Sequence, residues 1–411
     1  MIGVNTNSSD PKKLKAIMEK EELNWRSFGS REVTVKWNAS TPGYYVLDHH
    51  GVIRHKWMGN TGPGEKAIDT ALEKLIHEVK ETKGSEKTPE AIDRPQPLPM
   101  EIVDAWKAAG AKVGWLRTTQ LGFRSRQFVF HEFDAEQPAA PGDVPAFHLS
   151  RCQSGQIAKL PAPTVAFGLS LSRADVTDSA LKELAGLKSL QRLDLSVTEV
   201  TDAGLKELAG LTGLQTLNLD VTRITDAGLK ELSGLTNLQT LELNSTQVTN
   251  QGLKELAQLT KLNTLDLGFA KVTDAGLQEL AALKNLQELD LPRTQVTDAG
   301  VKELVGLENL RLLNVRASKV TDAGLRAVAE LKNLQALNLE FDKITDAGLK
   351  NLAPLTNLQS LKLAGTPISD AGLKELAGHK HLQTLWLGDT KVTAEGVAAF
   401  RKALPGCKII R

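Results

Sequence analysis

The sequence predicts an α/β solenoid, a stack of short units that each contribute one strand to a parallel sheet and one short helix. Leucine recurs in one column at steps of 24 residues, at Leu190, Leu214, Leu238, Leu262, Leu286, Leu310, Leu334, Leu358 and Leu382. Within a unit, Leu217 and Leu219 have the two-residue spacing of a strand, and Leu229 and Leu232 have the three-residue spacing of a helix. One unit cannot bury these leucines, so the units must stack, with strands on a concave face and helices on a convex face.

Ten such units occupy residues 166–404, because Ala166 takes the leucine column one step before Leu190. Their consensus is L-x-x-L-x-L-x-x-T-x-[VI]-T-D-A-G-L-K-E-L-A-x-L. The pattern resembles the leucine-rich repeats of bacterial proteins that carry long arrays of the 24-residue type, and the resemblance covers roughly residues 140–411. It implies one continuous parallel sheet whose strands are centred near Leu193 and its equivalents.

The N-terminal end of the array is expected to be capped, since a solenoid otherwise exposes the leucines of its first unit. Residues 100–165 are interpreted as this cap region. Within them, 142–165 predict a degenerate repeat whose apolar residues are Phe147, Cys152, Ile157 and Leu160. The elements expected before it are a helix and two strands, at 100–109, 112–117 and 127–133. A separate small binding module at 100–141 is the alternative interpretation of this aromatic-rich stretch.

The C-terminal end predicts a cap strand at 405–411, in which Ile409 takes the column of Leu385. The two cysteines of the chain, Cys152 and Cys407, then lie at opposite ends of the stack. A disulfide needs Cα atoms within about 7 Å, so the stack excludes a bond between them.

Residues 1–83 do not repeat and predict a small, incomplete α/β segment. Two strands are expected, at 44–48 and 52–56, around a His-His-Gly turn. With Thr41-Pro42 before them, they resemble the C-terminal half of a thioredoxin-like (redoxin) domain. That family's chemistry needs a Cys-x-x-Cys pair, but no cysteine precedes Cys152, so no redox activity carries over. The segment is either a degenerate remnant or the result of a late start to the chain. The proline-rich residues 84–99 predict a linker.

Composition limits the function classes. Lys and Arg (50) nearly balance Asp and Glu (49), which argues against a nucleic acid or a membrane surface as partner. The sequence contains no apolar run of about 18 residues and opens without a signal-peptide pattern. As written, a cytoplasmic location is expected, or export if the true N-terminus lies upstream. No nucleophile–base set, metal-ligand spacing or cofactor motif stands out, so we expect no catalytic residue, no metal, no cofactor and no enzymatic activity.

Aspartate recurs in one column of the repeat, at Asp178, Asp202, Asp226, Asp274, Asp298, Asp322, Asp346 and Asp370. A row of carboxylates could hold a metal. However, Thr-Asp before Ala-Gly-Leu-Lys-Glu-Leu is a helix-start signal, in which side-chain oxygens accept hydrogen bonds from free N–H groups. We therefore expect these side chains to cap their own helices. A threonine column, at Thr198, Thr222, Thr246, Thr294, Thr366 and Thr390, is expected to bond the backbone of the turn.

The residue between the two strand leucines is expected to point into the concave face. This column contains Ser170, Asp194, Asn218, Glu242, Asp266, Asp290, Asn314, Asn338, Lys362 and Trp386, and its first half is acidic. Phenylalanine and arginine lie beside it. The expected partner-binding residues are Phe269, Arg293, Arg316, Phe341, Asp266, Asp290 and Glu340. Exposed aromatic and arginine side chains within a polar rim are typical of protein-binding hot spots.

The sequence thus favours a non-catalytic scaffold whose concave face binds an unidentified protein or peptide. The acidic residues beside the phenylalanines favour a partner with a basic rim around an apolar centre. A concave face that is merely solvated is the open alternative, and residues 100–141 are the next candidate site. The second function hypothesis is a redox-linked thioredoxin-like protein whose Cys-x-x-Cys portion is missing from this chain.

Overall fold

The computed structural model describes residues 43–47, 53–58, 98–121, 124–132 and 143–411, and the chain divides into two compact units between Ile92 and Asp93. In the first unit, β1 (Gly43–Leu47) and β2 (Ile53–Met58) form an antiparallel pair, as the sequence predicts. The Thr41-Pro42 motif, the His-His-Gly turn and most of residues 84–99 lie outside the described residues. The thioredoxin-like resemblance therefore stays a prediction.

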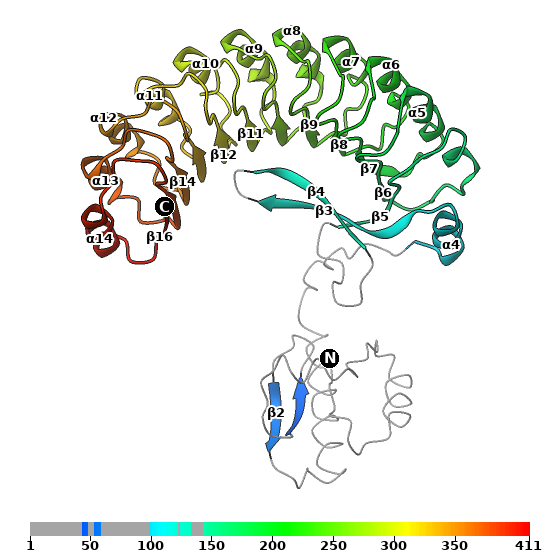
Figure 1. Cartoon of the computed structure of the whole chain (residues 1–411), viewed down its shortest axis with the longest axis horizontal. Helices are drawn as coiled ribbons and strands as arrows, with labels where there is room; N and C mark the ends of the chain where they lie inside the picture. The colour runs from blue at the N-terminus through cyan, green and yellow to red at the C-terminus, as the bar shows by residue number, and fades with distance from the viewer. Residues whose placement is uncertain (1–42, 48–52, 59–97, 122–123, 133–142) are drawn as a thin grey trace, which may run out of the picture. The chain divides into compact units, whose positions relative to one another are not determined.

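The second unit is built on one sheet in which the strands from β5 to β16 lie in chain order and pair in parallel (Figure 1). The strands are β5 (Val144–His148), β6 (Phe167–Ser170), β7 (Leu190–Asp194), β8 (Thr216–Asn218), β9 (Thr240–Glu242), β10 (Thr264–Asp266), β11 (Glu288–Asp290), β12 (Leu312–Asn314), β13 (Ala336–Asn338), β14 (Ser360–Lys362), β15 (Thr384–Trp386) and β16 (Lys408–Ile410). The prediction of one continuous parallel sheet with a strand in each repeat is confirmed.

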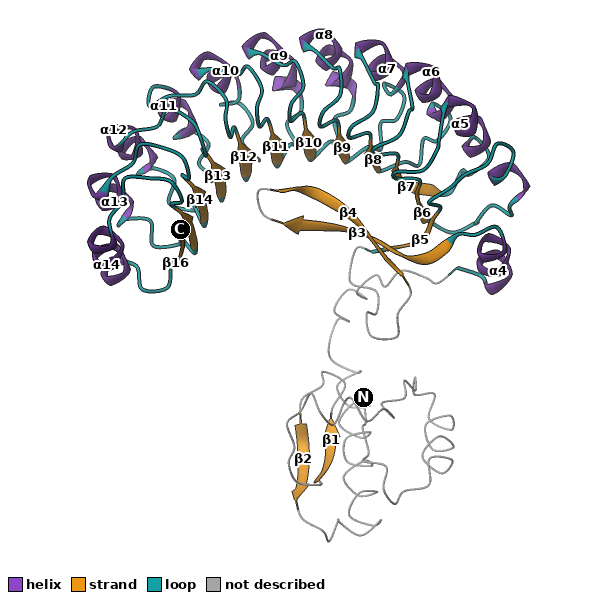
Figure 2. Ribbon diagram, in the orientation of Figure 1, coloured by secondary structure: helices purple, strands orange, loops and turns teal. Residues whose placement is uncertain are grey.

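Short helices cover the opposite side of the stack, so that strands line the concave face and helices the convex face (Figure 2). They are α5 (Asp178–Leu184), α6 (Asp202–Leu205), α7 (Asp226–Glu231), α8 (Asn250–Leu253), α9 (Asp274–Glu279), α10 (Asp298–Glu303), α11 (Gly324–Val328), α12 (Asp346–Leu349), α13 (Asp370–Leu376) and α14 (Ala394–Ala403). Several continue into 3-10 turns, at Lys206–Leu208, Lys254–Gln258, Leu280–Ala282 and Lys350–Leu352. The leucines of both elements meet in one continuous apolar core, where Leu217, Leu219, Leu229 and Leu232 are fully buried.

The turn after each strand is held by the threonine column. The Thr222 hydroxyl donates a hydrogen bond of 2.6 Å to the carbonyl of Leu219, and Thr198, Thr246, Thr294, Thr366 and Thr390 repeat this bond three residues back. The residue before each of these threonines has a positive φ, a backbone conformation that residues other than glycine seldom adopt. The expected role of the threonine column is confirmed.

The aspartate column differs from the expectation. The helix-capping oxygen in most units belongs to the preceding threonine, as where Thr249 Oγ1 accepts from the N–H of Gln251. The aspartate instead reaches the next unit: Asp226 accepts hydrogen bonds from the N–H and the hydroxyl of Thr249, at 2.7 and 2.6 Å. The same paired bonds start from Asp178, Asp202, Asp274, Asp298, Asp322, Asp346 and Asp370. These bonds form an aspartate ladder that joins neighbouring repeats.

Before the first full repeat, α4 (Met100–Ala108) packs against the repeat-like segment around β5, and the buried residues of both belong to the continuous core. The Trp106 ring stacks on Phe147 with 4.2 Å between centroids, and its indole N–H donates to the carbonyl of Pro161 at 3.0 Å. Two strands longer than expected, β3 (Lys112–Leu121) and β4 (Arg124–Glu132), extend the sheet antiparallel beyond β5.

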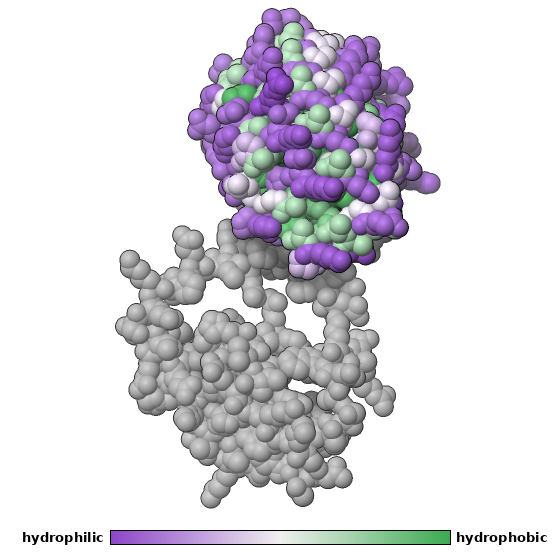
Figure 3. Space-filling view, turned by 90° about the vertical axis from the view of Figure 1, so that its left-hand side faces the viewer, coloured by the Kyte–Doolittle hydropathy of each residue, from purple (hydrophilic) through white to green (hydrophobic). Residues whose placement is uncertain are grey.

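The C-terminal cap consists of α14 and β16. Ile409 pairs with Leu385, the register that the repeat columns predict. On the end of the array that Figure 3 faces, polar side chains surround the apolar ones.

Candidate functional site

A row of residues, most of them exposed, lies just beyond the C-terminal ends of the strands, along one edge of the concave face, at the positive-φ position of each repeat. Its members are Arg173, Val197, Val221, Ser245, Phe269, Arg293, Ala317, Phe341, Gly365 and Asp389, with φ between 55° and 71°. Four large apolar residues of this row are roughly half exposed: Val197 (43%), Val221 (51%), Phe269 (49%) and Phe341 (50%). We call Phe269, Arg293 and Phe341 of this row, together with Arg316 and Glu340 beside it, the edge cluster.

Each phenylalanine of the edge cluster is paired with an arginine from a neighbouring repeat. The Arg293 guanidinium lies 5.3 Å from the centre of the Phe269 ring, and that of Arg316 lies 4.9 Å from the centre of the Phe341 ring. Arg316 Nε also forms an ion pair of 3.3 Å with Glu340 Oε2. Such cation–π contacts at exposed sites contribute about 0.5–1 kcal/mol each and hold the rings in defined positions. The cluster therefore presents two oriented aromatic rings to solvent.

The position of the phenylalanines is costly for an isolated fold. A bulky residue at positive φ stores on the order of 1 kcal/mol of backbone strain, and both rings leave about half of their surface in water. The Phe341 ring lies directly over Gly365, where a Cβ would collide with it. Gly365 thus makes room for the ring, which the repeat pattern alone did not indicate.

Two of the seven expected partner-binding residues are not exposed. Asp266 is fully buried and Asp290 is 4% exposed, and their neighbours in the column, Asn218, Glu242 and Asn314, are buried too. Strand alternation places these side chains on the concave side, but the surface there is covered. Strand alternation by itself does not determine whether a side chain on that side is exposed. The expectation of an open acidic column is therefore wrong for the strands from β6 to β13.

Burial changes the acid–base behaviour of this column. It raises the pKa of Asp290 well above the usual range, and the nearby Asp266 raises it further, while a hydrogen bond from Asn314 lowers it. Burial and then Asp266 also raise the pKa of Asp220, to about 8. The carboxyl groups of Asp220 and Asp290 thus both interact with that of Asp266 and do not behave as separate surface charges.

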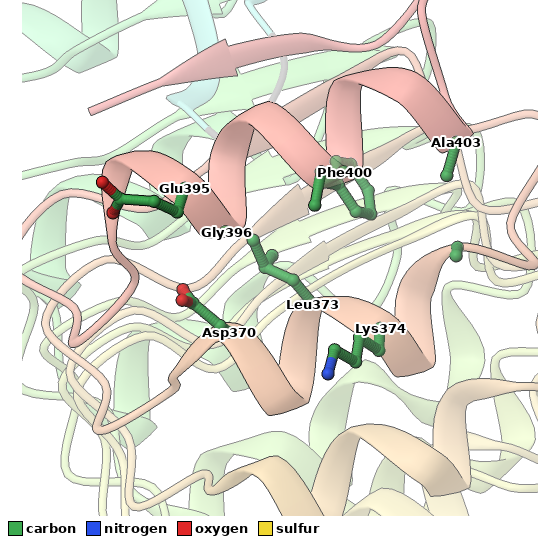
Figure 4. Close-up of a pocket in the computed structure, with 9 residues that line it drawn as sticks. Asp370, Leu373, Lys374, Glu395, Gly396, Phe400 and Ala403 are labelled. Atoms are coloured by element: carbon green, nitrogen blue, oxygen red, sulfur yellow. The ribbon is translucent and has the colours of Figure 1, made fainter.

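A second concavity, of about 340 Å³, lies between α13 and α14 (Figure 4). Asp370, Leu373 and Lys374 line it from α13, and Glu395, Gly396, Phe400 and Ala403 line it from α14. Asp370 forms the last step of the aspartate ladder, and the hydrogen bonds from Thr393 hold the pKa of its carboxyl below the usual range. The groove therefore belongs to the structural contact between the last two helices.

The described residues hold no group of three or more His, Cys, Asp or Glu side chains placed to bind a metal. Within the same residues, no helix is both long enough and apolar enough to cross a membrane. Cys152 and Cys407 are free and buried. Burial raises the pKa of the Cys152 thiol to about 11, with a further contribution from Glu183, so this sulfur is a poor nucleophile at neutral pH.

The family model of a leucine-rich repeat region matches residues 169–397, which is more than half of the chain. The protein therefore belongs to the leucine-rich-repeat family. A search of curated protein sequences gave no match.

Three similar solved structures were compared with the chain. An internalin (InlF) from Listeria monocytogenes is 22% identical over 62% of this chain and 81% of its own, with a TM-score of 0.43. An internalin C2 from the same species is 25% identical over 59% and 84%, with a TM-score of 0.35. The PEPR1–AtPEP1 structure is 20% identical over 59% and 34%, with a TM-score of 0.38.

Proposed function

We propose that the repeat region is a protein-binding scaffold that recognises its partner through the edge cluster. The observation that carries this proposal is the pair of half-exposed phenylalanines, each held at positive φ and each covered on one side by an arginine. Neither ring adds to the leucine core, and both cost solubility and backbone strain. Aromatic and arginine side chains that are positioned in advance are typical of the centres of protein–protein interfaces.

The charge around the cluster indicates the kind of partner. Asp266 and Asp290 are buried and cannot form an acidic rim in this conformation. The remaining charges of the cluster are those of Arg293, Arg316 and Glu340, and Glu340 is already paired with Arg316. The cluster therefore carries a net positive charge. It favours a folded protein or peptide with an apolar centre and an acidic rim, instead of the basic rim that the sequence suggested.

Replacing Phe269 and Phe341 by serine should weaken partner binding by at least about 1 kcal/mol, a fivefold or greater loss of affinity, as is typical of truncated hot spots. Folding should change little because neither side chain is buried in the core. Partners would first be captured from a native lysate with the wild-type chain, and the affinity of each would then be measured by titration calorimetry.

The matched control is Val197→Ser with Val221→Ser, since these residues have similar exposure and the same backbone conformation in the same row. The control should bind as the wild type does. Full affinity of the phenylalanine double variant, or an equal loss in the valine double variant, would place the binding site elsewhere.

The redox alternative predicts a reactive thiol, and the sequence provides none before Cys152. We therefore expect that the purified chain does not accelerate the reduction of insulin disulfides by dithiothreitol. Replacing both cysteines by alanine should not change the result. Faster insulin precipitation with the wild type than with this double variant would contradict a purely binding role.

A further inference from the structure

The hairpin formed by β3 and β4 starts on the concave side of the first repeats. Leu116 of β3 is fully buried, and its side chain fills the space beside Gly168 of β6, where a Cβ would lie 3.0 Å from Leu116 Cδ2. Arg192 of β7 donates a hydrogen bond of 2.9 Å to the Leu116 carbonyl. Both Gly168 and Arg192 occupy the strand column that faces away from the leucine core. Figure 1 shows the hairpin continuing along the concave side of the sheet.

Burial changes abruptly along the sheet in the column formed by the first residue of each strand from β8 to β15, the residue before the central strand leucine. Thr216, Thr240, Thr264, Glu288 and Leu312 are at most 5% exposed, whereas Ala336, Ser360 and Thr384 of the same column are half-buried. Thr264 and Thr384 are identical residues at the same strand position, so neither side-chain size nor the repeat geometry explains the difference. In this column the strands from β8 to β12 are covered and those from β13 onward are half-open; in the neighbouring column burial extends one strand further, to Asn338 of β13.

The covered strands and the hairpin have opposite charges. The concave side around β7 to β11 carries Asp194, Asp220, Glu242, Asp266, Glu288 and Asp290. The sequences of β3 and β4 contain four basic residues, Lys112, Arg117, Arg124 and Arg126, and one acidic residue, Glu132. Burial raises the pKa of Asp220 and Asp290, so these two carboxyl groups are largely protonated at neutral pH, and basic residues nearby would stabilise those acids of the set that stay ionised.

From the anchoring of Leu116, the step in burial and the opposite charges, we propose that the β3–β4 hairpin is a built-in occupant of the concave face, closing the strands from β8 to β12 against external ligands. A tethered segment acts at a high effective concentration, so an external ligand must displace the hairpin before it can bind these strands. Phe269, Arg293 and Phe341 of the edge cluster stay exposed while the hairpin is in place. This inference does not depend on the edge cluster being the partner site.

The test compares the accessibility of two threonines at the same strand position. In the full chain with Cys152→Ala and Cys407→Ala, either Thr264→Cys or Thr384→Cys is introduced and labelled with N-ethylmaleimide, an uncharged reagent. We expect the cysteine at 264 to react at least about 10-fold more slowly than the one at 384, because it reacts only when the hairpin opens.

Shortening the hairpin should remove this protection. The register pairs Arg117 with Val129, so replacing residues 118–128 by Asn-Gly leaves a two-residue turn at that pair. In this variant the cysteine at 264 should react at least about 10-fold faster than in the intact chain, while the cysteine at 384 keeps its rate. A second variant, Arg117→Gln with Arg124→Gln and Arg126→Gln, keeps the hairpin length and should also accelerate labelling at 264.

Three results would overturn the proposal. Equal labelling at 264 and 384 in the intact chain would mean that the hairpin does not cover β10. Unchanged protection at 264 in both hairpin variants would mean that the strands bury this position by themselves. Protection that disappears on dilution would mean that the hairpin of a second copy, not that of the same chain, occupies the face.

Discussion

Gly252→Ala should destabilise the protein by about 2–3 kcal/mol, although alanine is the better helix former by about 1 kcal/mol. Gly252 lies in α8, where an added Cβ would stand 2.5 Å from Asp226 Oδ1 and 3.1 Å from the Asp226 Cα. The carboxylate must then move and give up its two hydrogen bonds to Thr249. Chemical denaturation of the wild type and the variant measures the change.

A double-mutant cycle isolates the cause. In the Asp226→Ala background the carboxylate is gone, so Gly252→Ala should cost less than about 1 kcal/mol, a coupling of more than about 1 kcal/mol between the two positions. Gly234→Ala is the control, because a Cβ at Gly234 meets nothing within 4 Å. An equal loss of stability from Gly252→Ala in the wild-type and the Asp226→Ala backgrounds would show that the aspartate ladder is not the reason for glycine at position 252.

Asp342→Asn should stabilise the protein by about 2 kcal/mol at pH 8 and by little near pH 4. Burial raises the pKa of Asp342 to about 8, although the N–H and the hydroxyl of Ser318 donate to its Oδ1 and lower it. Within the described part of the chain, its Oδ2 is buried without a hydrogen-bond partner. Below pH 4 the carboxyl is protonated in both the folded and the unfolded state, so its ionisation does not change the free energy of unfolding of the wild type.

As the pH rises from about 4 to 8, the unfolded state ionises first, and the wild type loses stability that the asparagine variant keeps. The full difference in pKa would correspond to about 6 kcal/mol; relaxation of the site and the new, unsatisfied amide N–H₂ reduce the expected gain. Denaturation at pH 4.5 and pH 8 measures the gain, with the exposed Asp389→Asn as the control. A gain in stability that is the same at both pH values would contradict a raised pKa of Asp342 in the folded state.

Most of the repeat architecture could be predicted from the sequence because each column has its own period. The two-residue spacing of Leu217 and Leu219 fixes the strand, and the 24-residue step fixes the register, including Ile409 opposite Leu385. The side-chain orientation of the core follows from these two facts alone. The exposure of Phe269 and Phe341 could be predicted for the same reason, since the apolar columns beside them are already filled.

Contacts between neighbouring repeats, and contacts with segments outside the array, could not be predicted from these residue periods. The Asp226 carboxylate stands at a helix start, which is a capping signal within one unit, whereas its partner Thr249 is 23 residues away in the next. Asp266 is fully buried, and strand alternation gives the side on which a residue lies but not how much of that side is exposed. The sequence thus predicts the correct face for Asp266 and Asp290, but the expectation that they are exposed is wrong.

The role of the edge cluster as the partner-binding site is tested most directly by photo-crosslinking. Benzoylphenylalanine, which resembles the native side chain, would replace Phe269 or Phe341. Val305 would serve as the control because it is an exposed apolar residue two positions after the end of α10, on the helical side of the repeat. Irradiation in the presence of a captured partner should give a covalent adduct from positions 269 and 341 and none from position 305. An adduct from position 305 with none from 269 or 341 would contradict binding at the edge cluster.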